Sequence, residues 1–162
     1  MSILIIAEHN NLNLKSFSLN TINAAAKIDS DIHVLVAGNK CENVSKEVAA
    51  IPLVKKVLQS ESANYENYLA ENLTPLVVKM ADKYTHIIAS ANTFGKNFMP
   101  RVAAMLDTSQ ISDIILIISP FAKTTVNPDT TVLIVPYFTA IVPEAEHAAI
   151  PPSAASAPGS IG

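Results

Sequence analysis

Short apolar runs alternate along the chain with segments whose apolar residues recur at helical spacing. Continuous apolar runs, rich in β-branched residues, occur at 3–7, 32–37, 86–89 and 113–118, each beside polar or glycine-containing turns. Runs of this length and composition are typical of strands that are buried on both faces. A shorter run at 56–58 predicts one more strand.

The segments between these runs are predicted to be helices. Three of them place apolar residues on one helical face, namely Leu19, Ile22, Ala25 and Ala26; Val44, Val48 and Ile51; and Phe98, Val102, Met105 and Leu106. Residues 65–84 are predicted to form a broken helix with a new start at Thr74 and Pro75, because threonine can cap a helix and proline suits its first position. The buried stripe expected there is Leu73, Leu76, Val77, Met80 and Tyr84.

The alternation of strands and helices predicts an α/β fold with three layers, in which a mainly parallel sheet carries helices on both faces. Residues 131–135 predict a further strand, which Pro136 would restrict to an edge of the sheet. We expect one domain over residues 1–142. Residues 143–162 are dominated by proline, alanine and serine and are expected to be disordered, as a frayed terminus or as a linker.

Composition narrows the possible functions. The 162 residues are 49% hydrophobic and 15% charged, which suits a sheet covered on both faces and a surface that contacts a partner. A net charge of −3 does not favour nucleic-acid binding. No apolar run approaches the roughly 20 residues of a membrane span, and the single Cys41 fits a reducing compartment. We therefore expect a soluble, cytoplasmic protein without membrane insertion.

Ligands of open parallel sheets bind beyond the carboxyl ends of the strands, where three loops of this chain meet. These loops cover residues 8–10, 38–40 and 90–97. Gly95 allows a backbone conformation closed to other residues, and Lys96 brings positive charge near a helix N-terminus, which favours anions. The candidate cofactor-binding residues are Glu8, Gly38, Asn92, Thr93, Gly95, Lys96 and Asn97.

The same loop has a simpler interpretation, in which Asn97 caps the helix and Pro100 lies in its first turn. The chain has neither a Walker sequence nor a G-x-G-x-x-G motif, so both interpretations stay open.

No catalytic residue and no metal site is predicted. His9, His33, His86 and His147 lie far apart without ligand spacing, and packing or an ordinary polar contact is expected for His33 and His86. Cys41 precedes a helix, where its pKa could be lowered, although a plain free thiol is the alternative. On these residues the chain is not an enzyme.

Longer stretches carry a specific resemblance. LIIAEHNNLNL at the start, YTHIIASANTFGKN, and TFGKNFMPRVAAMLDTSQISDI over residues 93–114 resemble the N-terminal domain of the electron-transfer flavoprotein alpha subunit. The resemblance extends over about residues 2–120. It implies an adenine-nucleotide-hydrolase-like (Rossmann-like) fold and an electron carrier rather than an enzyme. In that family the alpha and beta subunits form a heterodimer that passes electrons from flavin dehydrogenases to the respiratory chain.

The resemblance also implies where the cofactors belong. The family's N-terminal alpha domain packs against the beta subunit, its C-terminal alpha domain holds most FAD contacts, and AMP is held by the beta subunit. This chain ends where the linker into the FAD domain is expected, and NPDTTVLIVPYFTAIVPEAEHAAIPP departs from the family pattern. FAD is therefore implied for the assembly and not expected to be held tightly by this chain alone. The alternatives are a stand-alone adenine-nucleotide-binding module and an inactive truncated remnant.

Overall fold

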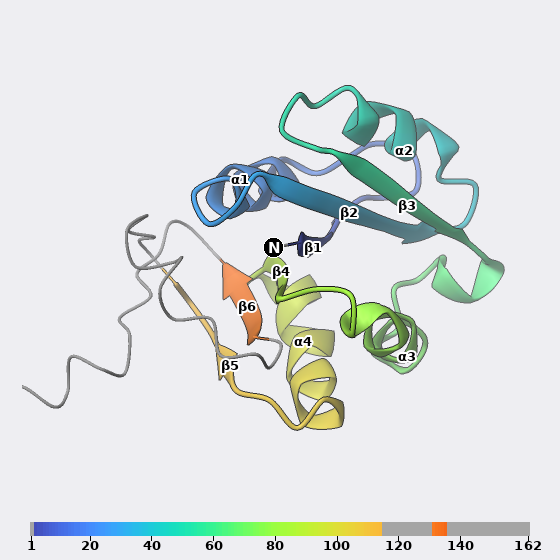
Figure 1. Ribbon diagram of the computed structural model, residues 1–162. Helices are drawn as coiled ribbons and strands as arrows, with labels where there is room; N and C mark the ends of the chain where they lie inside the picture. The colour runs from blue at the N-terminus through green and yellow to red at the C-terminus, as the bar shows by residue number, and fades with distance from the viewer. Residues whose placement is uncertain (1, 115–130, 136–162) are drawn as a thin grey trace, which may run out of the picture.

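The computed structural model describes residues 2–114 and 131–135, which form one α/β unit (Figure 1). In chain order its elements are β1 (Ser2–Ile6), α1 (Ser16–Ala25), β2 (Asp31–Gly38), α2 (Glu42–Ala49), β3 (Lys56–Glu61), the 3₁₀ turn η1 (Ala63–Tyr65), α3 (Ala70–Ala81), β4 (His86–Ser90), α4 (Thr93–Met105), β5 (Gln110–Ile111) and β6 (Thr131–Val135). The domain boundary expected at residue 142 and the tail at 143–162 lie outside the described residues.

The strands form one six-stranded sheet in the order β3-β2-β1-β4-β6-β5, and all of its pairs are parallel. The helices α1 and α2 lie on one face of this sheet, and α3 and α4 lie on the other (Figure 1). The predicted three-layer α/β fold is therefore confirmed. The chain moves outward from β1 to β3 and then resumes at β4 on the other side of β1, so the order of strands reverses between β1 and β4.

Both faces of the central strands are buried, which explains their unbroken apolar sequences. Along β1, Ile3 and Ile5 pack in the core beneath α1 and α2, whereas Leu4 and Ile6 pack beneath α3 and α4. All four side chains are at most 2% exposed. Because successive strand residues point to opposite faces, a strand with two covered faces has no polar alternation.

Strand limits differ from the prediction at three places. β3 extends to Glu61 rather than ending at residue 58. Of the strand predicted at 113–118, residues 113 and 114 are not strand, and the remainder lies outside the described residues; a short β5 at Gln110–Ile111 occurs instead. The strand at 131–135 is present, but its predicted edge position is wrong, since β6 lies between β4 and β5.

The helix predicted to start at Thr74 and Pro75 begins earlier. α3 starts at Ala70 with Leu69 as its N-cap, and both Thr74 and Pro75 lie inside it. The Thr74 hydroxyl is buried without a hydrogen-bond partner, so it caps nothing. Burial of Ala70 and the residues after it outweighs the local start signal and the cost of a proline inside the helix. In the predicted stripe, Leu73, Val77 and Tyr84 are buried and Leu76 and Met80 partly buried.

Two residues predicted to face the core are exposed, Leu19 on α1 and Met105 on α4. The buried face of α1 includes the polar Ser18 and Thr21, so a search for apolar residues alone misplaces it. The buried face of α4 consists of Phe98, Met99, Val102 and Ala103 together with Gly95, and Met105 lies off that face.

Gly95 is required for a reason other than the one predicted. Its φ is not positive, so the expected special backbone conformation is absent, and the residue lies in the first turn of α4. A Cβ added at Gly95 would overlap the backbone carbonyl of Ser90 and contact Ala89 Cβ at 3.5 Å. The glycine therefore lets α4 approach the end of β4 closely.

We predict that Gly95→Ala destabilises the domain, although alanine normally stabilises a helix relative to glycine. The added methyl group has to displace backbone, which should lower the free energy of unfolding by about 2 kcal/mol. Urea unfolding of both chains measures the difference. Ala104→Gly, at an exposed position of the same helix, is the control and should cost about 1 kcal/mol through helix propensity alone. A Gly95→Ala chain more stable than the parent would contradict the close approach.

Candidate functional site

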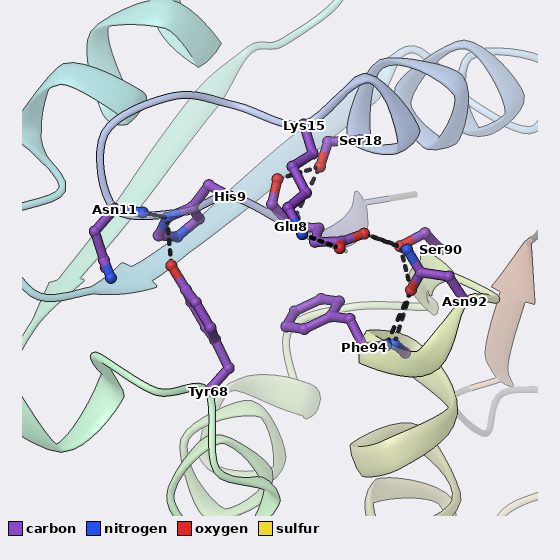
Figure 2. A network of polar contacts seen from close by, with 10 residues as sticks. Glu8, His9, Asn11, Lys15, Ser18, Tyr68, Ser90, Asn92 and Phe94 are labelled. Atoms are coloured by element: carbon purple, nitrogen blue, oxygen red, sulfur yellow. Dashed lines mark hydrogen bonds and ion pairs between the residues drawn. The ribbon is translucent and has the colours of Figure 1, made fainter.

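The carboxyl ends of β1 and β4 bring Glu8 and Asn92 into direct contact, as Figure 2 shows. The Asn92 side-chain amide donates a hydrogen bond to Glu8 Oε2, and Lys15 Nζ lies 2.9 Å from Glu8 Oε1. Ser90 Oγ lies 3.2 Å from Glu8 Oε2 and 3.3 Å from Asn92 Oδ1, so its one hydrogen can be donated to either. Glu8 is only 7% exposed. Its carboxylate is thus buried at the point where the strand order reverses, with three polar partners.

The backbone around Glu8 holds this carboxylate in position. The Ser18 hydroxyl accepts a hydrogen bond from the Glu8 N–H at 2.8 Å and donates to the Glu8 carbonyl at 2.9 Å. The Lys15 N–H also donates to the Glu8 carbonyl, at 3.0 Å. Ser18 is buried in the first turn of α1, so these hydrogen bonds attach the loop after β1 to that helix.

Asn92, and not Asn97, caps α4. Its backbone is extended, and its Oδ1 accepts hydrogen bonds from the N–H groups of Phe94 at 3.1 Å and Gly95 at 3.4 Å. Asn97 is an exposed residue within the helix, and Pro100 lies in the helix interior rather than in its first turn. The prediction that the loop caps a helix is confirmed, but the helix begins earlier, so most of residues 90–97 belong to α4.

The other candidates on α4 do not point toward the Glu8 carboxylate. Lys96 Nζ forms an ion pair with Asp113 at 2.8 Å, and both side chains are about half exposed. Thr93 and Asn97 lie on the exposed surface of the helix. Of the seven predicted residues, Glu8 and Asn92 are in contact, Gly95 joins them through its backbone N–H, and Gly38 lies in a second cluster.

This second cluster joins the loops that follow β1 and β2. A Cβ at Gly38 would overlap Asn11 Oδ1 and lie 2.7 Å from His9 Cε1, so only glycine leaves room for these two side chains. Asn11 Oδ1 accepts a hydrogen bond from the Asn39 N–H at 2.9 Å, and Asn11 Nδ2 donates to the Glu66 carbonyl at 3.1 Å. Hydrogen bonds therefore join the three segments at 9–14, 38–41 and 66–68.

His9 lies at the centre of this cluster. Its Nδ1 accepts a hydrogen bond from the Asn11 N–H at 3.1 Å and lies 2.9 Å from the Tyr68 hydroxyl. The neutral ring therefore carries its proton on Nε2. Burial lowers the pKa of His9 to about 4, against smaller raising effects of the Ala37 backbone and Glu8. Nε2 itself has no partner in hydrogen-bonding geometry, although the Ala37 backbone is close enough to favour the protonated ring.

Sequence reasoning placed His9 in the right loop but missed its partners Asn11 and Tyr68, as well as Ser18 beside Glu8. Asn11 has a signal that could have found it, because asparagine tolerates the left-handed backbone that it adopts here, with φ 67°. No local pattern indicates Tyr68, which meets His9 across 59 residues of sequence.

The other residues considered in the sequence analysis lie away from the two clusters or make ordinary contacts. Burial raises the pKa of the Cys41 thiol, so the possibility of an activated cysteine is wrong. His33 contacts Tyr84 and His86 contacts Thr85, as ordinary polar contacts, while His147 lies outside the described residues. Within residues 2–114 and 131–135 no three His, Cys, Asp or Glu side chains are placed to hold a metal ion. The helices of the same residues are all too short or too polar to span a membrane.

The geometry limits what could bind at this edge of the sheet. An anion at the N-terminus of α4 would compete with Asn92 for the same N–H groups and would lie beside the Glu8 carboxylate. A separate cavity of about 230 Å³ is lined by Lys40, Glu42, Asn43 and Glu61 at the start of α2, where two carboxylates oppose one ammonium. At the first place the N–H groups are already taken. At the second place the N-terminus of α2 has no side-chain cap, but two carboxylates outweigh one ammonium, so neither place combines free N–H groups with a net positive charge.

A parallel sheet covered on both faces, with its strand order reversing beside a capped helix, defines a Rossmann-like α/β domain. The chain belongs to the family of electron transfer flavoprotein domains, whose family model matches residues 3–132. The resemblance seen in the sequence is thereby confirmed.

Individual relatives agree with this family. The chain is 49% identical over 120 residues to the electron transfer flavoprotein subunit alpha of Pseudomonas aeruginosa, covering 74% of this chain and 39% of the relative. It is 46% identical over 119 residues to the mitochondrial subunit alpha of Dictyostelium discoideum, covering 68% and 34%. With that of Bradyrhizobium diazoefficiens it shares 43% identity over 120 residues, covering 74% and 38%. The chain thus matches little more than a third of the length of these relatives.

We predict that Glu8→Gln lowers the free energy of unfolding by about 1–3 kcal/mol. The substitution replaces one acceptor oxygen of the carboxylate by an NH2 group, which would then face another donor. Lys15 and Asn92 both donate to this group, so neither orientation of the glutamine satisfies both. Urea unfolding at neutral pH measures the loss. Glu71→Gln, which alters an exposed carboxylate paired with Arg101, should change stability little. Equal effects of the two substitutions would contradict the importance of the buried contact.

Proposed function

We propose that this chain acts as the N-terminal domain of an electron-transfer flavoprotein alpha subunit and takes part in electron transfer by assembling with a beta-type subunit. The assembly would carry electrons from flavin dehydrogenases to the respiratory chain. The family match and the three relatives named as alpha subunits support this assignment. Because the chain matches only part of these relatives, the activity is proposed for the assembly and not for this domain alone.

The observation that carries a role through protein contacts is the closed polar edge of the sheet. Asn92 occupies the free N–H groups of α4, and Glu8 places a carboxylate beside them. A dinucleotide such as FAD needs donors for its pyrophosphate, and the donors at the start of α4 are already used within the domain. We therefore infer that the domain is a non-enzymatic scaffold and that FAD belongs to the assembly. No electron-transfer step is assigned to the residues of this chain.

The proposal is tested by co-expressing the chain with a beta-type subunit from the same organism and measuring the mass of the purified complex. We expect a complex with one copy of each subunit. A Rossmann-like protein of similar size and net charge, expressed in place of the chain, serves as the control for unspecific association. Failure of the two subunits to associate while the chain remains folded by circular dichroism would refute the assembly.

Purification of the chain alone tests the cofactor assignment. We expect it to be colourless and to give no heat of binding with AMP or ATP by calorimetry, because the α4 N–H groups are already capped. A stoichiometric flavin spectrum would show that the chain itself holds the cofactor. Binding of AMP that is weakened by Lys96→Ala would instead support a stand-alone nucleotide-binding module.

A further inference from the structure

Two residues with left-handed backbone meet at His9. Asn11, in the loop after β1, has φ 67°, and Tyr68, in the segment between η1 and α3, has φ 52°. For tyrosine this conformation is unfavourable and persists only where surrounding contacts hold it. The Tyr68 ring packs edge-on against His9, with ring centroids 5.2 Å apart, and against Phe94 at 5.9 Å. Figure 2 shows the Tyr68 hydroxyl directed at the His9 ring from the segment before α3.

Both donors at His9 are directed at a single nitrogen. The Asn11 N–H donates to Nδ1, and the Tyr68 hydroxyl, 2.9 Å from the same atom, donates as well. A proton on Nδ1 would make that atom a donor. The Tyr68 hydroxyl could rotate to accept, but a backbone N–H cannot, so protonation removes the hydrogen bond that holds Asn11 in its left-handed conformation.

We propose that residues 62–69 form a latch that stays closed on the loop after β1 only while His9 is neutral. The latch is fastened by Tyr68 on His9, by the Glu66 carbonyl on Asn11, and by the Ser62 N–H on the Gly38 carbonyl at 3.0 Å. Protonation of His9 removes the hydrogen bond from the Asn11 N–H to Nδ1, which frees Asn11 and loosens its contact with the Glu66 carbonyl, and the latch opens. The device is independent of the proposed electron-transfer role.

The groups around the His9 ring, charged and uncharged, come from several elements. Glu8 favours the protonated ring, but its carboxylate is bonded to Lys15 and Asn92, and Lys15 opposes protonation. The segment after β2 contributes the buried Cys41 thiol, whose neighbouring carboxylate is Glu61 at the end of β3, and α4 contributes the uncharged Phe94. Glu66, within the latch, bonds Asn39 at 3.2 Å. Because Glu66 carries a carboxylate within the latch, its contribution is tested separately.

Amide hydrogen exchange of the whole chain, followed by NMR at pH 7 and pH 5 and corrected for intrinsic exchange rates, tests the latch. The probes are the amides of Asn11, Tyr65 and Tyr68. With a ring pKa of about 4 when the latch is closed and about 6.5 when it is open, the opening constant should rise about 20-fold between these pH values. The amide of Val34, in the buried strand β2, is the internal control and should not change in parallel.

Variants separate His9 from the other titrating groups. In His9→Asn the side-chain oxygen can accept at the place of Nδ1 without titrating, so the 20-fold rise should disappear. His86→Gln, at the amino end of β4, and Glu66→Gln should both keep it. Persistence of the rise in His9→Asn, or its loss in Glu66→Gln, would overturn the proposal.

Tyr68→Phe provides a second test if His9→Asn does not fold. Loss of the hydroxyl should open the latch more often at pH 7 and move the pKa of His9 toward 6.5, as followed by the NMR shift of its Cε1 proton. An unchanged pKa of His9 in Tyr68→Phe would show that the latch and the ring are not coupled.

Discussion

The buried contact between Glu8 and Asn92 is the interaction on which the carboxyl edge of this domain depends. A carboxylate removed from water is costly unless charged and hydrogen-bonding partners compensate for it. Lys15, from the loop after β1, and Ser90 and Asn92, from the end of β4, supply that compensation. The same asparagine starts α4 by capping its first N–H groups. One polar contact thus fixes the loop after β1, the end of β4 and the position of a helix.

This contact also determines what the edge of the sheet offers to other molecules. In many open parallel sheets, the helix that begins beside the reversal of strand order presents free N–H groups to a phosphate. Here Asn92 takes those groups, and Glu8 adds negative charge next to them. Because the donors at the start of α4 are satisfied within the domain, this edge suits contacts with protein better than it suits a phosphate. That property supports the assembly role that we propose.

The sequence predicts the layers of this fold well because they depend on burial alone. The apolar runs at 3–7 and 86–89 lie within a residue of β1 and β4, since strands covered on both faces have no polar residues to confuse the pattern. Helix starts are harder. Thr74 with Pro75 and Asn97 with Pro100 are both acceptable local start signals, yet both helices begin earlier. The start of α4 depends on where β4 ends, which a rule based on capping residues alone does not take into account.

The candidate site could be predicted only as far as its loops. Beyond the carboxyl ends of the strands, polar residues show no periodicity, and their partners are chosen by the folded chain. Glu8 meets Asn92 across 84 residues and His9 meets Tyr68 across 59. The requirement for the two glycines of this region could not be predicted correctly from the sequence either. Gly38 is needed because side chains of the loop after β1 approach it closely, and Gly95 because the end of β4 does, and neither is needed for a positive φ. What the edge of the sheet can bind is therefore a property of tertiary packing, which the order of residues along the chain does not reveal.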